Sequence, residues 1–597
     1  MFPHYVKGSN VENYIQVEEQ ATLFGSGLVA LGNQPGQETF IGIFSQNRPE
    51  WAVTDIACMH YSMISVPFYN TVDIRACDRI ITQTNMETIV CDTLEKADRL
   101  RVEHSALRSL KTLIVMDLPT EGVGEQKAAF EAEGLKLVSF DDVISCGVKN
   151  VVDRVLPKPE TINTLVYTSG TTGLPKGVPH THKTLIATHA YAWQTLSEEV
   201  SPGRNDRTIS YLPLPHVYER SSLHICMMTG TQYGFFQGDP LKLIDDIQAL
   251  KPTAFGAVPR VLNRVYDRVM SNVNASSLTK RTLFNLAYKQ KSKSLARGEK
   301  RTDTIWDKLV FTKIRSQLGG RIKFICSAAA PLAPETAQFL RVTITRNFFE
   351  AYGQTEAPVI AHTVPHDVTS GHVGIPGGDS QIKLIDVPEL DYYSNNDQGE
   401  VCVKGSHVFN GYYRDPEMTS QVLDGDGWLR TGDIGRWNKN GTLAIIDRKK
   451  DIFKLSQGVY IAPEKIENFY LREPLVAQAF VTGDSSKDCL VGIMVPDQEE
   501  LEKFAKKQNI PGCFEELCQN EKVKATIFSR MMKHGKAEGL VGFEQVKGIH
   551  IHSKPFSEAE GLLTPTLKSK RNVMHQVFAE EIDEMYSEID REAKRLK

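Results

Sequence analysis

The chain has 597 residues, of which 41% are hydrophobic and 24% are charged, and its formal net charge is −4. This length predicts several domains or subdomains, each able to bury its own core, and the composition is that of a soluble globular protein. The slightly negative charge argues against a nucleic-acid-binding protein, and no membrane-spanning helix is expected because no run of eighteen apolar residues occurs.

Ten cysteines are scattered over the chain, several of them within apolar stretches. The closest pair, Cys513 and Cys518, has no histidine or further cysteine at zinc-binding spacing. We therefore expect reduced, mostly buried thiols, as in a cytosolic protein. The N-terminal residues, Met1 to Lys7, are too polar for a secretory signal peptide.

Helix-like and strand-like patterns alternate in the first part of the chain. Apolar residues recur at helical spacing over residues 11–31, and residues 40–44 form a short apolar run typical of a buried strand. A helix-like segment and three strand-like segments follow, at 50–62, 64–68, 88–91 and 112–116. This alternation predicts parallel βαβ units.

Residues 167–177 read Tyr-Thr-Ser-Gly-Thr-Thr-Gly-Leu-Pro-Lys-Gly and follow an apolar run at 164–167. Glycines let successive backbone N–H groups turn toward an anion, and the hydroxyl groups and the lysine add further phosphate ligands. A strand that leads into such a loop predicts nucleotide binding. The string differs from a Walker loop, since Lys176 lies three residues after Gly173 and is followed by Gly177. The alternative is a solvated glycine–threonine loop.

The middle of the chain contains further strand patterns at 255–258 and 322–325 and a Lys/Arg-rich stretch at 278–301. We expect that stretch to form a helix with a solvated, charged face. Residues 381–446 then change to short strands separated by turn clusters, and these strands lie at 382–385, 399–404 and 442–446.

After residue 447 the pattern becomes α+β. A helix is expected to begin at Pro463, because proline and acidic residues favour the first helical turn. Two strands, at 477–482 and 490–495, and two helices are expected to follow. We place a hinge at 447–451 and a small C-terminal domain beyond it.

A second informative string, residues 349–356, places an aromatic ring, a glycine, a hydroxyl group and a carboxylate within five positions. Tyr352 is suited to stacking on a purine, and Thr355 to binding a phosphate oxygen. Glu356 offers the hard oxygen ligand that Mg²⁺ prefers. The alternative is a capped loop after a strand.

Two later strings add polar side chains of the same kind. Residues 427–433 end in Asp433, a carboxylate between tight turns that is suited to binding ribose hydroxyls. Residues 447–454 contain Arg448 and Lys454, which are suited to ribose and phosphate. The alternative for this charged run is a solvated turn.

Together and in this order, the four strings resemble those of the acyl-adenylate-forming (AMP-binding) superfamily. The resemblance extends from about residue 10 to about residue 590. Further strings are similar to those of the long-chain fatty acyl-CoA synthetases, above all of their animal-type branch, and they lie at 213–220, 234–239, 399–405, 445–450, 460–468 and 561–568.

The resemblance implies an α/β fold with a large N-terminal AMP-binding domain at 1–446, built from βαβ subdomains and a β-rich subdomain at 381–446. It implies a hinge at 447–451 and a small, mobile α+β domain at 452–597. Members of the family use ATP and Mg²⁺ to convert a fatty acid to acyl-AMP with release of pyrophosphate. They then transfer the acyl group to coenzyme A (CoA) with release of AMP.

The resemblance also assigns expected site residues. Tyr352 and Gly353 match the adenine site, Thr355 the α-phosphate site, and Glu356 the Mg²⁺ ligand. Asp433 and Arg448 match ribose ligands, and Lys454 stays a candidate nucleotide contact from its place in the charged run. The loop that holds the β- and γ-phosphates is matched by Thr168, Ser169, Gly170, Thr171, Thr172, Gly173 and Lys176.

Two further residues are carried over as catalytic candidates. Lys568 matches the lysine that bridges the carboxylate and the α-phosphate, with the nearby Lys570 as the alternative. A lysine suits this role because it supplies a mobile point charge, and its departure implies rotation of the C-terminal domain between the two half-reactions. His216 matches a position on the acyl and pantetheine route, where we expect a positioning role.

Three departures from the family pattern stand out. Ala328 replaces a usual glycine and would crowd the adenine pocket if the backbone there had a positive φ. Val217 and Tyr218 replace the usual residues at the mouth of the acyl tunnel. The animal-type relatives carry a longer N-terminal region with a membrane anchor, whereas this chain begins close to the adenylating core.

The leading hypothesis is therefore an ATP-dependent long-chain fatty acid:CoA ligase. Its expected partners are small molecules, namely the fatty acid, ATP and CoA, with peripheral membrane contact and no nucleic acid. The expected location is the cytoplasm, with the cytosolic face of the endoplasmic reticulum or of the mitochondrial outer membrane left open. Two alternatives remain: an adenylate-forming ligase for another carboxylic acid, and an acyl- or nucleotide-binding relative that has lost turnover.

Overall fold

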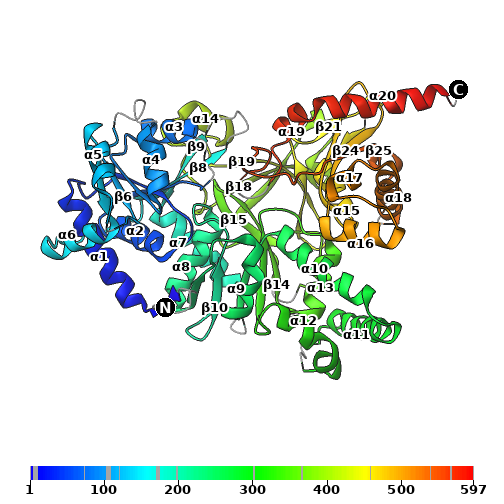
Figure 1. Cartoon of the computed structure of the whole chain (residues 1–597), viewed down its shortest axis with the longest axis horizontal. Coiled ribbons are helices and arrows are strands. Elements are labelled where there is room, and N and C mark those ends of the chain that lie inside the picture. The colour runs from blue at the N-terminus through cyan, green and yellow to red at the C-terminus, as the bar shows by residue number, and fades with distance from the viewer. Residues whose placement is uncertain are drawn as a thin grey trace.

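The chain folds around several separate sheets, and its C-terminal part stands apart from the rest (Figure 1). The computed structural model describes residues 2–3, 11–70, 72, 74–102, 109–119, 121–169, 175–195, 200–299, 303–364, 367–457, 459–537, 539–564 and 568–595. Two short pairs form separate two-stranded sheets: β1 (Phe2–Pro3) with β2 (Val11–Glu12), and β21 (Phe453–Lys454) with β22 (Tyr460–Ile461).

The first sheet has seven strands in the order β7-β6-β5-β3-β4-β8-β9. All neighbouring pairs are parallel except β8 with β9, which form an antiparallel hairpin. The predicted βαβ units are thus confirmed, and the hairpin is a feature that the alternation did not predict. The strands are β3 (Phe40–Phe44), β4 (Ile64–Pro67), β5 (Thr88–Cys91), β6 (Thr112–Val115), β7 (Lys136–Ser139), β8 (Ile162–Ser169) and β9 (Pro175–Thr181).

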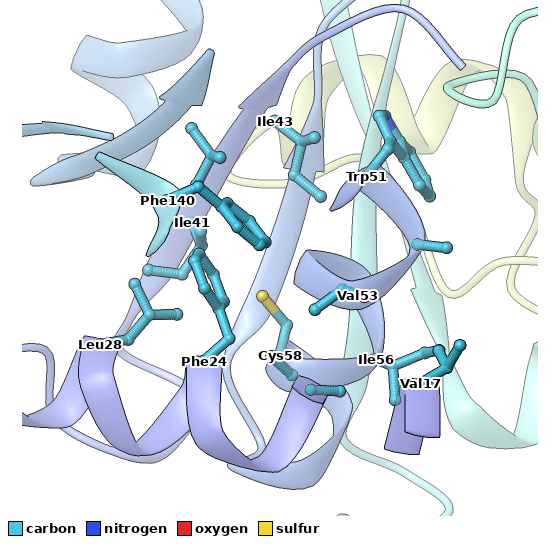
Figure 2. Close-up of a cluster of buried hydrophobic side chains, with 14 of the residues drawn as sticks. Val17, Phe24, Leu28, Ile41, Ile43, Trp51, Val53, Ile56, Cys58 and Phe140 are labelled. Carbon is cyan, nitrogen blue, oxygen red and sulfur yellow. The ribbon is translucent and has the colours of Figure 1, made fainter. Parts of the chain in front are cut away.

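Helices cover both faces of this sheet, as a parallel sheet requires. One face packs against α1 (Tyr14–Ala30), α2 (Pro49–His60) and α6 (Phe140–Lys149). The other packs against α3 (Ile74–Thr84), α4 (Leu94–Val102) and α5 (Gly124–Ala132). In the first of these cores the rings of Phe24 and Phe140 stack with centroids 4.3 Å apart, beside Ile41 of the sheet (Figure 2).

A second sheet has the order β12-β13-β14-β15-β16, with β12, β13 and β14 parallel. Its strands are β12 (Ala254–Ala257), β13 (Phe324–Ala328), β14 (Phe348–Gln354), β15 (Ala357–His362) and β16 (Ile375–Pro376). A parallel pair, β10 (Arg207–Ser210) and β11 (Gln232–Phe235), lies nearby. The associated helices are α7 (His182–Thr195), α8 (Val217–Thr229), α9 (Leu243–Leu250), α10 (Pro259–Ala275), α11 (Leu278–Ala296), α12 (Thr312–Gln317) and α13 (Pro334–Thr343).

The β-rich segment forms a four-stranded antiparallel sheet in chain order. Its strands are β17 (Gln381–Ile385), β18 (Gln398–Lys404), β19 (Leu429–Trp437) and β20 (Leu443–Arg448), with α14 (Pro416–Val422) inserted before β19. The three strands expected at 382–385, 399–404 and 442–446 are confirmed, and β19 completes the sheet.

Beyond residue 451 the chain builds its own core around the sheet β23-β24-β25. The helix expected at Pro463 and the strands expected at 477–482 and 490–495 are confirmed. The expected totals of two strands and two further helices are too low, because a third strand pairs in parallel with β24 and five helices follow α15 in the described residues. The strands are β23 (Val476–Gly483), β24 (Leu490–Pro496) and β25 (Val546–Ile551), and the helices are α15 (Pro463–Tyr470), α16 (Gln498–Gln508), α17 (Phe514–Cys518), α18 (Glu521–Ala537), α19 (Arg571–Val577) and α20 (Ala579–Arg595).

Two expectations from composition can be compared with the fold. No disulfide joins the ten cysteines, and most of them are buried. In the described parts of the chain, no helix combines the length and the apolar character that crossing a bilayer demands.

Candidate functional site

A cavity of about 3090 Å³ lies where the N-terminal sheets meet the C-terminal part. Its wall takes residues from β14 and β19 on one side, and from α15 and the segment after β25 on the other. Ordinary ligand pockets measure roughly 300–1,000 Å³, so this cavity has room for several substrate groups at once.

The tip of the β8–β9 hairpin carries the first glycine-rich string. Thr168 and Lys176 are register partners at the mouth of the hairpin, and both line the cavity. The Nζ atom of Lys176 lies 5.4 Å from the ring centroid of Tyr412, where a cation–π contact holds it. Ser169 ends strand β8. Four predicted phosphate ligands, Gly170, Thr171, Thr172 and Gly173, lie outside the described residues.

The second string forms the β14–β15 hairpin, with Thr355 and Glu356 as its two-residue turn. Gly353 is required there, because a Cβ atom at this position would lie 2.1 Å from the carbonyl oxygen of Pro358. The Glu356 carboxylate accepts a hydrogen bond of 2.7 Å from the Tyr412 hydroxyl to Oε1. The hairpin therefore presents a fixed carboxylate to the cavity.

The third and fourth strings meet on neighbouring strands of the four-stranded sheet. Asp433 of β19 and Arg448 of β20 are register partners, with Arg448 Nε 3.4 Å from Asp433 Oδ1. The Tyr352 hydroxyl donates a hydrogen bond of 2.5 Å to Oδ2 of the same carboxylate. Asp433 itself is almost fully buried, and its backbone N–H donates to Oγ1 of Thr431. An aromatic ring, a carboxylate and a guanidinium thus share one wall of the cavity.

Lys568 enters the same cavity from the C-terminal part. Thr564 and Lys568 close a tight turn, since Thr564 N–H donates to the Lys568 carbonyl and Lys568 N–H donates to Thr564 Oγ1. The pKa of Lys568 is lowered to about 8, first by burial and then by the nearby Arg448 guanidinium, against the opposite effect of Glu464 and Asp433. The ammonium group is therefore close to the cluster on β19 and β20.

His216 lies at the N-terminus of α8, where its Nδ1 accepts a hydrogen bond of 3.2 Å from the backbone N–H of Tyr218. The pKa of His216 is lowered to about 4, first by burial and then by the charge of Lys568. The ring is therefore neutral at physiological pH, with its proton on Nε2 because Nδ1 is an acceptor.

The alternative lysine, Lys570, also lines the cavity and directly precedes α19. Lys454 does not belong to the cavity wall: it lies on β21 with Nζ 4.9 Å from the Tyr460 ring centroid. The structure thus brings together, from both parts of the chain, Thr168, Lys176, His216, Tyr352, Gly353, Thr355, Glu356, Asp433, Arg448 and Lys568.

The concern about Ala328 is corrected by the backbone. Ala328 ends strand β13, and the residue with positive φ is its neighbour Ala329, at +79°. A non-glycine residue at such a φ is strained by about 1–2 kcal/mol, so the surrounding structure holds Ala329 in an unfavourable backbone conformation at the cavity wall. At the position expected for the mouth of the acyl tunnel, the Tyr218 hydroxyl donates a hydrogen bond of 2.8 Å to the carbonyl oxygen of Cys326 on β13.

Sequence reasoning missed two residues of the site. Tyr412 fixes both Glu356 and Lys176, but its Gly-Tyr-Tyr string at 411–413 carries no recognisable chemistry on its own. Lys450 lines the cavity, and burial lowers its pKa. The charged run at 447–454 contained the signal for Lys450, yet only a spatial arrangement could separate it from Lys454.

Comparison with known proteins agrees with this geometry. Residues 3–413 match the family model described as AMP-binding enzyme. The chain is 46% identical over 581 residues to long-chain-fatty-acid–CoA ligase 5 of Rattus norvegicus, covering 97% of this chain and 84% of that protein. It is 44% identical over 578 residues to long-chain-fatty-acid–CoA ligase 6 of Homo sapiens, covering 96% and 82%.

Among solved structures, the adenylation domain of a carboxylate reductase from Mycobacterium chelonae superposes with a TM-score of 0.77 at 25% identity. The match covers 96% of this chain and 84% of that one. The corresponding domain from Segniliparus rugosus, solved in complex with AMP and a co-purified carboxylic acid, gives a TM-score of 0.77 at 24% identity, covering 97% and 88%. The match to the Segniliparus rugosus domain, at 24% identity, supports the fold alone.

Proposed function

The chain belongs to the AMP-binding enzyme family, and from that membership we propose that it is an ATP-dependent ligase joining long-chain fatty acids to CoA through an acyl-AMP intermediate. The observation that supports this proposal most directly is the convergence of Lys176, Glu356, Asp433 and Lys568 on one cavity. These four charged side chains come from four separate segments and both parts of the chain.

In the first half-reaction, the fatty carboxylate attacks the α-phosphate of ATP and pyrophosphate leaves. This step needs charge neutralisation and alignment more than covalent participation of the protein. Lys176 and the hydroxyl of Thr168 are placed to bind the departing phosphates. In this proposal Lys568 bridges the incoming carboxylate and the α-phosphate, and Lys570 is the alternative.

The nucleoside is assigned to the wall formed by Tyr352, Asp433 and Arg448. The Asp433 carboxylate has lone pairs to spare after accepting from Tyr352, so it is able to accept bonds from ribose hydroxyls. The Tyr352 ring and the backbone at Gly353 supply a flat surface for adenine.

Magnesium is the metal that this arrangement suits. A Mg²⁺ ion is usually bound by one or two carboxylates together with substrate phosphates. Only Oε1 of Glu356 accepts the hydrogen bond from Tyr412, which leaves Oε2 for a hard cation. The ion would supply charge neutralisation for the phosphates, while Tyr412 keeps the carboxylate in position.

The second half-reaction requires sites for the acyl chain and for CoA. The cavity continues along α8 past Val217 and Ile225, a surface suited to an alkyl chain. On α10, Arg260, Arg264 and Arg268 follow one another at four-residue spacing along the cavity, which suits the phosphates of CoA. Burial lowers the pKa of Arg260, and the charge of Arg264 lowers it further, as expected for cations gathered before an anion binds.

We also propose the domain division 1–446, hinge 447–451 and mobile domain 452–597. The Lys449 side chain binds Glu389 at 2.9 Å on the N-terminal side, while Asp447 accepts the backbone N–H of Glu464 on the other. Contacts across the interface include polar pairs such as Arg472 with Glu335, at 2.8 Å. Partly exposed pairs of this kind contribute about 0–1 kcal/mol, so they oppose rotation only weakly.

The test is an assay of the purified chain with palmitate, Mg-ATP and CoA. We expect release of pyrophosphate and AMP and formation of palmitoyl-CoA. Pyrophosphate release with short or aromatic acids only would instead identify a ligase for another carboxylic acid. Nucleotide binding without pyrophosphate or thioester would identify a relative that has lost turnover. A cytoplasmic location with peripheral membrane contact belongs to the same proposal, because long-chain fatty acids are amphiphilic.

A further inference from the structure

Helix α11 and the helical segment that follows it carry an unusual concentration of exposed apolar side chains. Five of the nineteen large hydrophobic residues exposed in the described chain lie within residues 278–309, which is about a twentieth of its length. Isolated exposed leucines are normal, but such clustering marks an interaction surface. Their exposed fractions are 68% for Leu278, 41% for Leu283, 54% for Leu286, 65% for Ile305 and 58% for Leu309.

These side chains belong to one unit. The Trp306 indole N–H donates to Oε1 of Gln290, one turn after Leu286, and Lys291 pairs with the buried Asp307. Arg315 binds the other oxygen of Asp307, at 2.5 Å. The exposed residues on both sides of this polar seam are therefore held together, and we call them, with the basic residues around them, the α11 surface.

The charge of the α11 surface is strongly positive. Residues 278–315 contain eleven lysines and arginines but only three acidic residues, whereas the whole chain has a formal charge of −4. Asp307 is buried against Lys291 and Arg315, and Glu299 pairs with Arg297. The exposed cations include Lys280, Arg281, Lys289, Lys293 and Lys308.

Cations interleaved with exposed leucines are typical of a surface that meets an anionic lipid bilayer. An acidic protein would satisfy the charges, but it would not by itself explain apolar side chains spread between the lysines of this helical unit. Figure 1 places α11 at the periphery of the molecule, beyond α10 and α13. Because α10 lines the cavity and leads directly into α11, a bilayer at this surface would lie beside the cavity rim.

We propose that the α11 surface docks the protein on anionic membranes, with lysines at the headgroups and leucines inserted between them. Only the purpose of this docking, which is uptake of an amphiphilic acid from the bilayer, rests on the proposed function. Docking itself is independent of catalysis and is measured without it.

The experiment is cosedimentation of the purified chain with phosphatidylcholine vesicles, with or without phosphatidylserine. We expect binding only to the anionic vesicles, weakening as salt is raised. The variant Lys280→Gln/Lys289→Gln/Lys293→Gln should bind about a hundredfold more weakly, since each basic residue contributes about 1 kcal/mol, or about fivefold. The matched control Lys506→Gln/Lys507→Gln/Lys522→Gln removes three exposed lysines from α16 and α18 and should bind like the unmodified chain.

A second variant, Leu283→Ser/Leu286→Ser, tests insertion and should reduce affinity at least tenfold, because it removes two side chains that membrane contact would bury. Equal binding by the lysine variant and its control would overturn the proposal. So would failure of the unmodified chain to bind anionic vesicles, even if it binds an acidic protein. Ligase activity in detergent separates the two hypotheses: vesicle binding without turnover would contradict the proposed function alone.

Discussion

The Tyr352 hydroxyl lies 2.5 Å from Oδ2 of Asp433, so an aromatic ring on β14 and a carboxylate on β19 act as one unit. The two side chains belong to different sheets and are 81 positions apart in the chain. The proposed adenine and ribose contacts are therefore connected before any ligand arrives, and preorganisation of this kind reduces the entropic cost of binding.

Tyr352→Phe should keep the flat ring and lose the hydrogen bond that positions Asp433. A hydrogen bond to a charged group contributes about 1.5–3 kcal/mol, so we expect the KM for ATP to rise at least tenfold with a smaller change in kcat. Steady-state kinetics with varied ATP would measure both KM and kcat. Tyr393→Phe, outside the cavity, serves as the control. An unchanged KM in the Tyr352 variant would mean that the hydrogen bond from Tyr352 to Asp433 does not contribute to ATP binding.

Lys568→Ala should lower the rate of acyl-AMP formation by at least a hundredfold, because the charge that bridges carboxylate and phosphate is removed. Thioester formation from preformed acyl-AMP should be nearly unaffected. Single-turnover assays of the two half-reactions provide the measurement, with Lys570→Ala as the matched control. Equal loss of both half-reactions, or a larger loss in the Lys570 variant, would mean that Lys568 is not the lysine that bridges carboxylate and phosphate.

The lowered pKa of Lys568 also predicts a pH dependence. Because only the protonated amine carries the required charge, kcat/KM for ATP should fall as pH rises through about 8, the value that burial and Arg448 produce in the free protein. Lys568→Arg keeps its proton at this pH and should lack the alkaline fall, whatever its absolute rate. A wild-type profile that is flat up to pH 9.5 would contradict this assignment.

His216→Asn should preserve the cap of α8, since asparagine is among the best N-cap residues, whereas His216→Ala should destabilise the protein by about 0.5–2 kcal/mol. Because burial lowers the pKa of His216 to about 4, no acid–base limb between pH 6 and 8 should disappear in either variant. Chemical denaturation and pH–rate profiles provide the measurements. Loss of such a limb in the asparagine variant would indicate proton transfer by His216.

A buried ion pair supports the wall behind His216. Arg220 of α8 pairs with Asp55 of α2, both side chains being 1% exposed, and also donates to Ser65 Oγ at 2.7 Å. Although burial alone would raise it, the pKa of Asp55 is lowered by Arg220. Asp55→Asn should therefore destabilise the protein by about 3–5 kcal/mol, because it leaves a buried guanidinium without its counter-ion.

Chemical denaturation at neutral pH would measure this loss. The matched control is Glu87→Gln, which breaks the exposed pair with Lys111 and should change stability by less than about 1 kcal/mol. Similar effects for the two substitutions would show that burial adds nothing to the Asp55 pair.

Local patterns predicted β3, β4, β5, β6, β8, β12 and β13, because their apolar runs are short and bounded by turns, but they did not predict β7, β14, β15 and β16. The same patterns could not reveal that β9 returns antiparallel beside β8, which depends on pairing between the segments on either side of the glycine-rich string. In the C-terminal part, β25 was missed because it pairs in parallel with β24 after a long helical excursion. Such non-local pairing leaves little trace in a single sequence.

The candidate site residues were predicted from the resemblance of their motifs to a known family, but their arrangement in space was not predicted. The sequence contained no sign that Tyr412 would hold both Glu356 and Lys176, since all three come from separate segments. It also could not tell that the strained backbone belongs to Ala329, next to the position that attracted attention.

The pairing of β19 with β20 shifts register between Ile434 and Gly435, and beyond that irregularity Asp433 faces Arg448. Since successive strand residues point to opposite faces, insertion or deletion of a single residue between Leu443 and Asp447 would move the side chains of Asp447 and Arg448 to the opposite faces of the sheet. The sheet itself would still form, but the wall proposed to bind the nucleoside would lose the guanidinium of Arg448. Variation in strand length, rather than in side-chain identity, is thus the kind of genetic change that this segment should tolerate least.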